Sequence, residues 1–404
     1  MSVHTLMFGW EYPPKHLGGL GVACQGLVRG LLKHGAKVTL VLPHGEGEGD
    51  EGLNLLSPTE TQRHTVRVKS MLQPYDSPES FSKRVSLSSI PKGGAGPLYA
   101  GDLGAAVHEF TELSVEMTKD VSPDVVHSND WMTFGAGAKA AHYHHVPFVA
   151  HVHATELDRT HFHPNEWIFA REREGFMKAD HIITVSQFTK NILIREYGIS
   201  GDKIDVVHNG TTDAPQIAPI TTLQETHPLI LFIGRLTVQK GPFHFLEAAR
   251  IVHAHLPNAR FVLAGEGYLL PELIERSCSL GLSEDVIFAG RVTQNEAKSL
   301  YARARCFVMP STSEPFGLVA LEAIAHGAPV ILSKQSGVSE VVSHAFHIDF
   351  WDIEKLADCI ITVLREEPLA LQLRSEAVHT LHRLTWENQA ARVLSVYDKV
   401  RTRF

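Results

Sequence analysis

Two cationic side chains follow an apolar run in the second half of the chain. The segment GRLTVQKG at residues 234–241 places Arg235 and Lys240 directly after residues 229–233, whose composition predicts a strand. Ligands of α/β proteins bind at the carboxyl ends of such strands. A guanidinium can bind two phosphate oxygens at once and an ammonium adds a point charge, so this loop predicts a site that stabilises a leaving diphosphate. An ordinary surface turn also tolerates both residues, but that alternative does not explain their place after a strand.

Two carboxylates stand in the segment STSEPFGLVALEAIAHG, residues 311–327, after a predicted strand that ends at Met309. Proline is favoured in the first turn of a helix, so we expect a helix to start near Pro315. Glu314 then lies just before the helix and Glu322 two turns into it, roughly 10 Å further along at the rise of an α-helix. That separation suits the two ends of one nucleoside diphosphate sugar, with the hexose at Glu314 and the ribose at Glu322.

The diphosphate of such a ligand needs partners between its two ends. Helix N-termini attract anions through their backbone amides and the helix dipole. We therefore expect the diphosphate to lie over four amides, those of Phe316, Gly317, Leu318 and Val319. In the alternative interpretation Glu322 is solvated and Glu314 only adds charge to the helix start.

A glycine-rich turn follows the first predicted strand, residues 5–8. It runs through Lys15 into GGLG at residues 18–21 and opens a helix. Backbone amides at such a turn can contact an anion, so we include Lys15, Gly18 and Gly19 in the candidate ligand site. The turn lacks the G-x-G-x-x-G pattern and no acid ends the second predicted strand, which argues against a nicotinamide dehydrogenase. Glycines that serve tight packing alone remain an alternative.

The elements that must position these residues alternate along the chain, with short β-branched runs between amphipathic helical stretches. The first half contains predicted strands at residues 5–8, 37–42, 124–127, 148–151, 181–185 and 203–207. After a stretch rich in proline and threonine, strands are predicted at residues 229–233, 260–264, 286–289, 306–309 and 330–332. We therefore predict an α/β protein of two Rossmann-like domains, residues 1–212 and 213–385, with parallel sheets facing across a cleft. Residues 386–404 are expected to form a helix that packs back on the first domain.

The composition is that of an ordinary globular chain, with 404 residues of which 44% are hydrophobic and 20% charged. Every apolar run is shorter than a bilayer span and no secretory signal is recognisable, so we expect a cytoplasmic protein without a membrane span. The net charge of -8 argues against nucleic-acid binding. The acidic run at residues 45–52 is expected to be a solvated loop within a segment, residues 44–104, whose role the pattern leaves open.

Three signals agree in order and spacing with one known family. They are GRLTVQKG at residues 234–241, GEG at residues 265–267 after the next strand, and Glu314-x7-Glu322. On these motifs the chain resembles the family-4 retaining glycosyltransferases, which adopt the GT-B fold, and the similarity covers nearly the whole chain. The resemblance implies that Arg235 and Lys240 bind the donor diphosphate. It also implies that Glu314 holds the sugar hydroxyls and that Glu322 holds the ribose.

Motifs of the first half resemble the glycogen and starch synthases within that family. They are Trp10 with Lys15 and GGLG at 18–21, NDW at 129–131, HVH at 151–153, TVS at 184–186 and HNG at 208–210. Two positions differ from the synthase pattern, because Lys15 stands three residues before the glycine pair rather than two and Met132 replaces a histidine. The resemblance implies transfer of glucose from ADP- or UDP-glucose onto an α-glucan. Transfer to another acceptor, such as a cell-surface polysaccharide, a lipid or a small molecule, is the alternative.

The resemblance also implies front-face displacement, in which the leaving phosphate accepts the proton of the acceptor hydroxyl. His153 is then expected to bind the sugar from across the cleft, through its ring or its backbone carbonyl, and not to act as a nucleophile. A purely structural histidine is the alternative. The sequence contains no convincing Asp-x-Asp metal motif, so we predict no metal and no cofactor besides the nucleotide-sugar substrate. The oligomeric state is left open.

Two other classes of function are compatible with parts of the sequence. The 25 histidines, among them HYHH at residues 142–145, could indicate a metallohydrolase. Against it, H-E-x-x-H is absent, and we expect the side chains of His151 and His153 to point to opposite faces of the sheet. A protein that binds a nucleotide sugar without transferring it is the third hypothesis, and it would release no nucleoside diphosphate.

Overall fold

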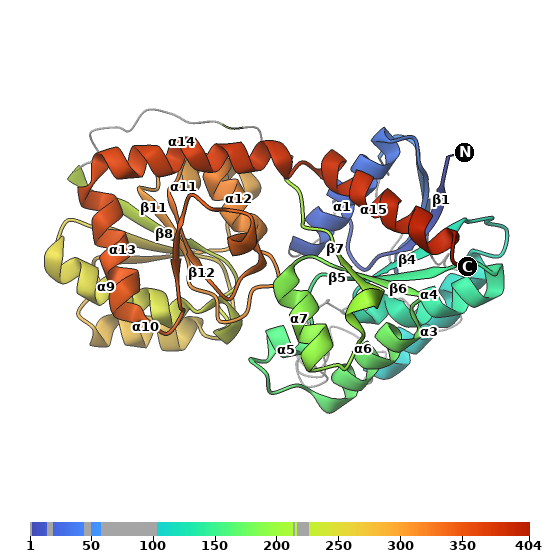
Figure 1. Cartoon of the computed structure of the whole chain (residues 1–404). Coiled ribbons are helices and arrows are strands. Elements are labelled where there is room, and N and C mark those ends of the chain that lie inside the picture. The colour runs from blue at the N-terminus through green and yellow to red at the C-terminus, as the bar shows by residue number, and fades with distance from the viewer. Residues whose placement is uncertain (1, 14–18, 44–49, 58–102, 213–214, 216–225) are drawn as a thin grey trace, which may run out of the picture.

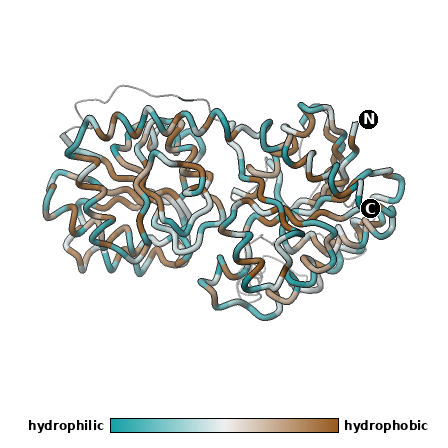
Figure 2. The backbone as a smooth tube through the Cα atoms, in the orientation of Figure 1, coloured by the Kyte–Doolittle hydropathy of each residue, from teal (hydrophilic) through white to brown (hydrophobic). Residues whose placement is uncertain are grey.

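The computed structural model describes the chain except for residues 1, 14–18, 44–49, 58–102, 213–214 and 216–225. Two α/β domains lie side by side, each built on a parallel sheet with helices around it (Figure 1). Figure 2 shows the apolar strands in the centre of each domain and the more polar segments outside, as burial of apolar surface requires. Lys15, Gly18 and most of the 44–104 segment lie outside the described residues.

The first domain contains, within the described residues, a seven-stranded sheet in the order β3-β2-β1-β4-β5-β6-β7, with every neighbouring pair parallel. Its strands are β1 (His4–Phe8), β2 (Lys37–Val41), β3 (Leu53–Leu56), β4 (Val125–Asn129), β5 (Phe148–Val152), β6 (His181–Thr184) and β7 (Ile204–Val206). Its helices are α1 (Gly19–Lys33), α3 (Leu103–Met117), α4 (Trp131–His144), α5 (Glu156–Arg159), α6 (Glu166–Lys178) and α7 (Gln187–Arg195).

The second domain contains a six-stranded parallel sheet in the order β10-β9-β8-β11-β12-β13. Its strands are β8 (Leu229–Ile233), β9 (Arg260–Ala264), β10 (Val286–Gly290), β11 (Cys306–Met309), β12 (Val330–Ser333) and β13 (Phe346–Ile348). Its helices are α9 (Pro242–His255), α10 (Leu270–Ser279), α11 (Gln294–Arg303), α12 (Leu318–Ala325), α13 (Ile353–Arg365) and α14 (Glu367–Arg383). The described residues of the two domains also form short 3-10 turns at Gly201–Lys203, Val238–Lys240 and Gly337–Glu340.

The two parallel sheets confirm the predicted fold class, and the predicted strands agree with the observed ones within two residues at each end. Two strands, β3 and β13, were missed. Both lie at an edge of their sheet, and most of their side chains are only partly buried. Edge strands are covered on fewer sides and need fewer apolar residues, so a short one leaves little signal in the sequence.

The last helix, α15 (Trp386–Arg401), lies beside α1 of the first domain (Figure 1). Its apolar side, which includes Trp386, Val393 and Tyr397, shares a hydrophobic cluster with Leu27 and Leu31 of α1. The helix follows α14 of the second domain directly, so the chain returns across the molecule at Thr385. There Thr385 forms a parallel bridge with Thr211. The chain segment that leaves the first domain therefore lies beside the segment that returns to it.

A carboxylate of the second domain holds the start of a first-domain helix. Glu340 accepts hydrogen bonds from the backbone amides of Gln187, at 2.9 Å, and Phe188, at 2.7 Å, in the first turn of α7. The Nε2 atom of His208 lies 3.0 Å from the same carboxylate. Negative charge is favourable at a helix N-terminus, so Glu340 stabilises the contact between the two domains.

Candidate active site

The loop after β8 turns back toward the end of β11. Its 3-10 turn is followed by Gly241, whose φ of 68° lies in the left-handed region. A Cβ atom at Gly241 would stand 2.1 Å from the backbone oxygen of Pro310, so no larger residue fits without moving the chain. This close approach brings Lys240 next to the segment that follows β11.

Lys240 and Glu314 form an ion pair at this meeting point. The Nζ atom of Lys240 lies 2.5 Å from Oε2 of Glu314, and the hydroxyl of Ser311 donates to the same oxygen at 3.2 Å. The carboxylate side chain is 7% exposed and the lysine side chain 20%. An ammonium has three N–H groups, so Lys240 can hold Glu314 and still donate to an anion on its open side.

Gln239 connects Arg235 to the same segment, a role that the sequence reasoning missed. Its side-chain oxygen accepts from Nη2 of Arg235 at 3.2 Å, and its amide nitrogen donates to the backbone oxygen of Ser313 at 3.0 Å. Its own backbone oxygen accepts from the amide of Thr312 at 2.9 Å. Gln239 is buried, so these bonds position the guanidinium of Arg235 relative to Glu314. The only signal in the sequence was a glutamine between the two cations of the predicted phosphate loop.

The helix that follows Glu314 starts later than predicted. Glu314 forms a parallel bridge with Ser336, and the backbone oxygen of Phe316 accepts from Val338 at 2.8 Å. These bonds keep the chain extended through Phe316, and α12 begins only at Leu318, after Gly317 at a φ of 110°. The expected start near Pro315 was wrong, because pairing with a distant segment outweighs the local preference of proline for a first helical turn.

The amides chosen for the diphosphate therefore fall into two groups. Leu318 and Val319 belong to the first turn of α12, where backbone N–H groups have no partner within the helix. Gly317 precedes them and carries no side chain that could cap them. Phe316 and Gly317 lie in the non-helical chain before this turn. The first-turn amides of α12 are the groups at which the helix dipole favours an anion.

Glu322 lies in the second turn of α12 and is partly exposed. The phenol of Tyr301, a residue of α11 that is 1% exposed, donates to Oε2 of Glu322 at 3.0 Å. The ring of Tyr301 also stacks on His326 at a centroid distance of 6.0 Å. Tyr301 therefore restricts the carboxylate of Glu322 to one orientation, a role that the sequence reasoning did not assign.

Replacing Tyr301 by phenylalanine should weaken binding of the nucleoside diphosphate by about three- to tenfold, because Glu322 loses the phenol that orients it. The ring and its packing stay in place, so the melting temperature should change little. Isothermal titration with UDP and with ADP checks the expectation. An unchanged dissociation constant for both nucleotides would mean that the orientation of Glu322 does not matter for binding.

The glycine-rich turn of the first domain reaches the start of α12. A Cβ atom built on Gly19 would stand 3.7 Å from Cδ1 of Leu318, which also packs against the first-domain cluster of apolar residues. The predicted sites of the two domains therefore meet at Gly19 and Leu318. Lys15 and Gly18, the other residues predicted for this turn, lie outside the described part of the chain.

His153 directly follows β5 and is 8% exposed. Its Nε2 lies 3.1 Å from the side-chain oxygen of Asn129, whose amide nitrogen donates to the backbone oxygen of Phe8. Because that asparagine oxygen can only accept, Nε2 of His153 carries the hydrogen and Nδ1 is an acceptor. Burial, and then the neighbouring His127, lower the pKa of His153 to about 3, so the ring is neutral.

A buried carboxylate fixes the backbone at His153. Asp130 has a φ of 60° and accepts from the amides of His153, at 2.7 Å, and Ala154, at 3.4 Å. Burial raises the pKa of Asp130 to about 6, and the charge of Arg159 and the two amides oppose that rise. Asp130 was part of the NDW motif, but sequence reasoning gave it no role. Its bonds hold the chain after β5 against the chain after β4.

His151 and His153 lie on the same side of the sheet, with stacked rings whose centroids are 4.3 Å apart. The expectation that they point to opposite faces was wrong, because alternate residues of an extended chain share a face. His151 contacts His127 at 3.2 Å, and His127 contacts the phenol of Tyr397 in α15 at 2.8 Å. Burial lowers the pKa of His127 to about 4. These neutral rings form a buried network beneath His153.

Metal ligands were the basis of the metallohydrolase hypothesis. Within the described residues, no group of three or more histidine, cysteine, aspartate or glutamate side chains is arranged to hold a metal ion. The histidine rings near β5 contact one another, Asn129 and Tyr397. Packing and hydrogen bonding therefore account for the histidines that gather near β5.

The first domain also contacts the Glu314 segment directly. The hydroxyl of Ser313 donates to the buried carboxylate of Asp158 at 2.5 Å, and Nδ1 of His161 lies 3.2 Å from the hydroxyl of Thr312. Asp158 in turn accepts from the amide and hydroxyl of Thr155, the N-cap of α5. Residues on both sides of the domain boundary thus position the chain next to Glu314.

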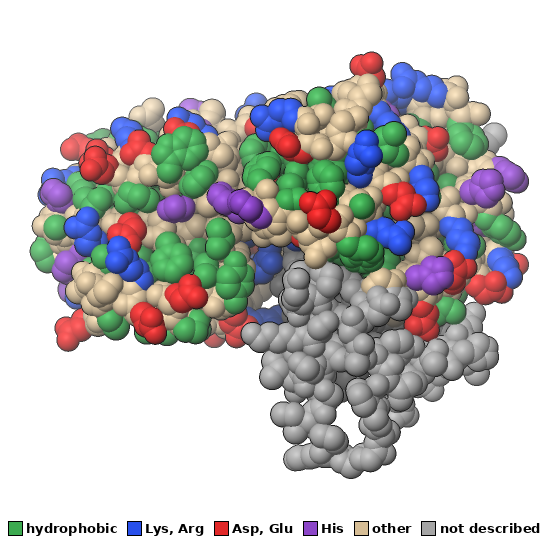
Figure 3. Space-filling model, turned by 90° about the horizontal axis from the view of Figure 1, so that it is seen from below, with side chains coloured by type: hydrophobic (Ala, Val, Ile, Leu, Met, Phe, Trp, Pro, Cys, Tyr) green, Lys and Arg blue, Asp and Glu red, His purple; other side chains and the backbone are tan. Residues whose placement is uncertain are grey.

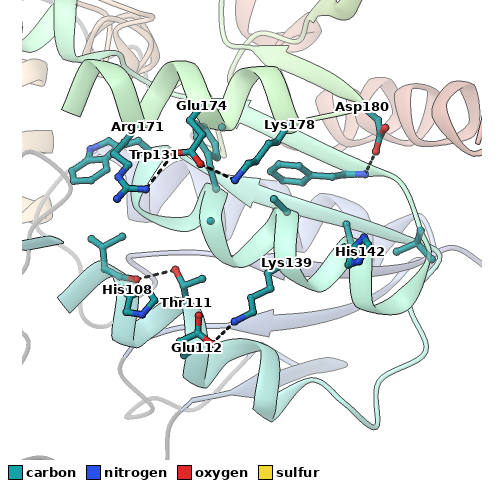
Figure 4. Close-up of a pocket in the computed structure, with 18 of the residues that line it drawn as sticks. His108, Thr111, Glu112, Trp131, Lys139, His142, Arg171, Glu174, Lys178 and Asp180 are labelled. Atoms are coloured by element: carbon teal, nitrogen blue, oxygen red, sulfur yellow. Dashed lines mark hydrogen bonds and ion pairs between the residues drawn. The ribbon is translucent and has the colours of Figure 1, made fainter. Parts of the chain in front are cut away.

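A separate pocket of about 690 Å³ opens between α3, α4 and α6 of the first domain (Figure 4). Its charged side chains are paired: Lys139 of α4 with Glu112 of α3, and Arg171 and Lys178 with Glu174 along α6. None of the residues predicted for the ligand site lines it. On the face drawn in Figure 3, acidic and basic side chains are likewise interspersed rather than gathered by sign.

Comparison with known proteins finds family matches over both domains. The family described as Glycosyltransferase Family 4 matches residues 17–214, and the family described as Glycosyl transferases group 1 matches residues 213–380. A glycogen synthase of Mycobacterium tuberculosis is 29% identical over 98% of this chain and 94% of its own length. A D-inositol 3-phosphate glycosyltransferase of Mycolicibacterium smegmatis is 30% identical over 76% of this chain and 75% of its own.

The fold also has solved counterparts. A sucrose-phosphate synthase from Thermosynechococcus elongatus aligns over the whole of both chains with a TM-score of 0.76 at 19% identity. In the described part of the chain, no helix is long and apolar enough to cross a membrane. The two sheets, the two family matches that together span residues 17–380 and these relatives agree. The chain belongs to the family-4 glycosyltransferases, and it is a nucleotide-sugar-dependent transferase with the GT-B fold.

Proposed function

We propose that this enzyme transfers glucose, with retention of configuration, from ADP- or UDP-glucose to the end of an α-glucan. The observation that carries the proposal is the ion pair of Lys240 and Glu314, held beside Arg235 by the bonds of Gln239. This arrangement puts two cations, which can bind a diphosphate, beside a carboxylate that can accept hydrogen bonds from sugar hydroxyls. The glycogen synthase relative, similar over nearly the whole chain, supports glucose and an α-glucan as the substrates.

In this proposal the protein accelerates the reaction mainly by placing charged side chains around the donor. Lys240 and Arg235 donate to the diphosphate as the bond between the anomeric carbon and its phosphate oxygen breaks. The acceptor hydroxyl attacks the same face of the anomeric carbon, and its proton moves to the departing phosphate oxygen. Glu314 accepts hydrogen bonds from sugar hydroxyls, Glu322 from the ribose, and His153 approaches the sugar from the first domain. The products are the extended glucan and the nucleoside diphosphate.

A phosphorylated small molecule is the second candidate acceptor. The relative named D-inositol 3-phosphate glycosyltransferase, 30% identical over three quarters of its length, favours it. Such an acceptor brings its own negative charge and would need a cation in the first domain. An α-glucan is neutral and needs apolar surface and hydrogen-bonding groups instead.

A screen of donors against acceptors tests the proposal. Purified enzyme is incubated with ADP-glucose, UDP-glucose and GDP-mannose, each with glycogen, maltohexaose, inositol phosphate or no acceptor, and nucleoside diphosphate release is measured. We expect release with a glucose donor and a glucan. Release only with the phosphorylated acceptor would replace the proposal by the second candidate. Tight donor binding with no release under any condition would support a binding-only protein.

Transfer should need no divalent ion, because Arg235 and Lys240 supply the positive charge that a metal would provide. Activity measured after dialysis against EDTA should therefore stay within about twofold of the untreated rate. Addition of Mg²⁺ or Mn²⁺ should not raise it further. Activity that chelation abolishes and either ion restores would overturn this expectation.

A further inference from the structure

Four aromatic rings from three separate segments meet beside the Glu314 segment, across the domain boundary. We call them the aromatic rim; they are His161, His244, Phe350 and Trp351. The ring of Phe350 lies 6.1 Å from His161, 5.3 Å from His244 and 4.9 Å from Trp351, measured between centroids. His161 comes from the first domain and the other three from the second. The rim is therefore complete only when the two domains lie together.

Hydrogen bonds tie the rim to the sugar end of the candidate site. The amide of Glu314 donates to the backbone oxygen of Gln335 at 2.8 Å, and the side chain of Gln335 donates to Asp349 at 3.3 Å. Asp349 precedes Phe350, just past the carboxyl end of β13. On the other side, His161 contacts Thr312 at 3.2 Å. The rim thus lies near Glu314, whereas Glu322 stands further along, in the second turn of α12.

The rim also carries energetic costs that packing alone does not explain. Trp351 is 61% exposed to solvent. His161 and Phe162 are consecutive non-glycine residues at φ values of 51° and 62°, and Phe162 is 42% exposed. Left-handed backbone in bulky residues is strained, and such strain concentrates at ligand sites. Exposed aromatic surface gathered in one place is a feature of binding surfaces.

We propose that the aromatic rim binds a sugar unit of the acceptor, with the pyranose ring stacked on Trp351. This inference rests on the proposed glucosyl transfer to an α-glucan. A pyranose has an apolar face of C–H groups, which fits the electron-rich face of an indole, and its hydroxyls remain free to bond at the edges. The anomeric carbon of the donor sugar reacts at the Glu314 end, so the acceptor must lie on that side.

The chemistry of the rim favours a neutral ligand over an anionic one. Burial, and then the nearby His161, lower the pKa of His244, so that ring adds no stable positive charge. Lys334, which precedes Gln335 in the chain, is paired with Asp349 at 2.8 Å. Lys240 and Arg235, the cations beside Glu314, are assigned to the donor diphosphate, so a phosphorylated acceptor would have to compete with the donor for them. A glucan chain would find apolar faces with hydrogen-bonding groups around them.

The test compares Trp351→Ala with Tyr143→Ala in the full-length enzyme. Tyr143 is 50% exposed on α4, away from the rim, and serves as the matched control. With maltohexaose as acceptor, Trp351→Ala should raise the acceptor KM by about tenfold and leave the donor KM within about twofold. Trp351→Phe keeps an aromatic face and should recover most of the loss. Tyr143→Ala should match the wild type in both constants.

A binding measurement separates this inference from the proposed function. Of the five tryptophans, Trp351 is the most exposed, so acrylamide quenching reports mainly on it. Maltohexaose should protect the wild type from quenching, and this protection should disappear in Trp351→Phe, which lacks the reporter indole, but not in Tyr143→Ala. If the wild type elongates maltohexaose but Trp351→Ala keeps the normal acceptor KM, the role of the rim is wrong and the proposed function stands. A wild type that elongates no glucan with any donor would overturn the proposed function.

Discussion

Replacing Lys240 or Arg235 by alanine should lower turnover at saturating donor by about 100-fold, while donor affinity falls less. Both cations face negative charge that grows as the glycosidic bond breaks, and only contacts that strengthen in the transition state accelerate the step. Arg235→Lys should recover turnover only in part, because lysine keeps the charge and loses the planar fork. Steady-state rates of nucleoside diphosphate release, measured with an acceptor identified by the screen, give the comparison.

Two further variants make this result interpretable. Lys33→Ala removes an exposed cation from the end of α1 and should leave turnover unchanged. Lys240→Ala also strands the carboxylate of Glu314, which is 7% exposed and would lose its ammonium partner. The double variant Lys240→Ala with Glu314→Gln removes that stranded charge. If the double variant regains normal turnover, the loss comes from the stranded carboxylate and the leaving-group role of Lys240 is wrong.

Replacing Glu322 by alanine should weaken donor binding by about 1–3 kcal/mol, because the ribose loses charged hydrogen-bond acceptors. The carboxylate is partly exposed on α12, and alanine favours a helix, so the fold should remain intact. Isothermal titration with UDP, ADP and the corresponding glucose donors measures the effect, and circular dichroism checks the fold.

The size of the Glu322 effect should exceed that of Tyr301→Phe, since the phenol acts on the ligand only through the carboxylate. In the double variant the two losses should not add, because without Glu322 the phenol has nothing to orient. Unchanged nucleotide affinity in Glu322→Ala would remove the ribose assignment. Additive losses would show that Tyr301 contributes to binding by a separate route.

Several parts of this protein could be predicted from local pattern. Apolar runs such as residues 229–233 and 306–309 become strands β8 and β11 because β-branched and apolar residues need burial in a sheet. Alternation of such runs with amphipathic stretches is a property of the chain alone, and it indicates parallel sheets covered by helices. The cations of the loop after β8 could be selected in the same way, since ligand sites of α/β proteins lie at strand ends.

Other features depend on residues that are far apart in the chain. Lys240 and Glu314 are separated by 74 positions, and Ser313 and Asp158 by 155. No local pattern specifies such contacts, because they arise from the order of strands in a sheet and from the placement of one domain against the other. The roles of Gln239 and Tyr301 follow from hydrogen bonds of this kind.

At the start of α12, a local preference competes with contacts to a distant segment of the chain. Pro315 locally favours a first helical turn, yet Glu314 and Phe316 bond to the segment after β12 and remain extended until Gly317. A local preference of about 1 kcal/mol or less loses to several backbone hydrogen bonds and the packing around them. Helices and strands with a strong periodic pattern can thus be predicted from the sequence. The positions of caps, ion pairs and domain contacts depend on which distant groups the fold brings within bonding distance.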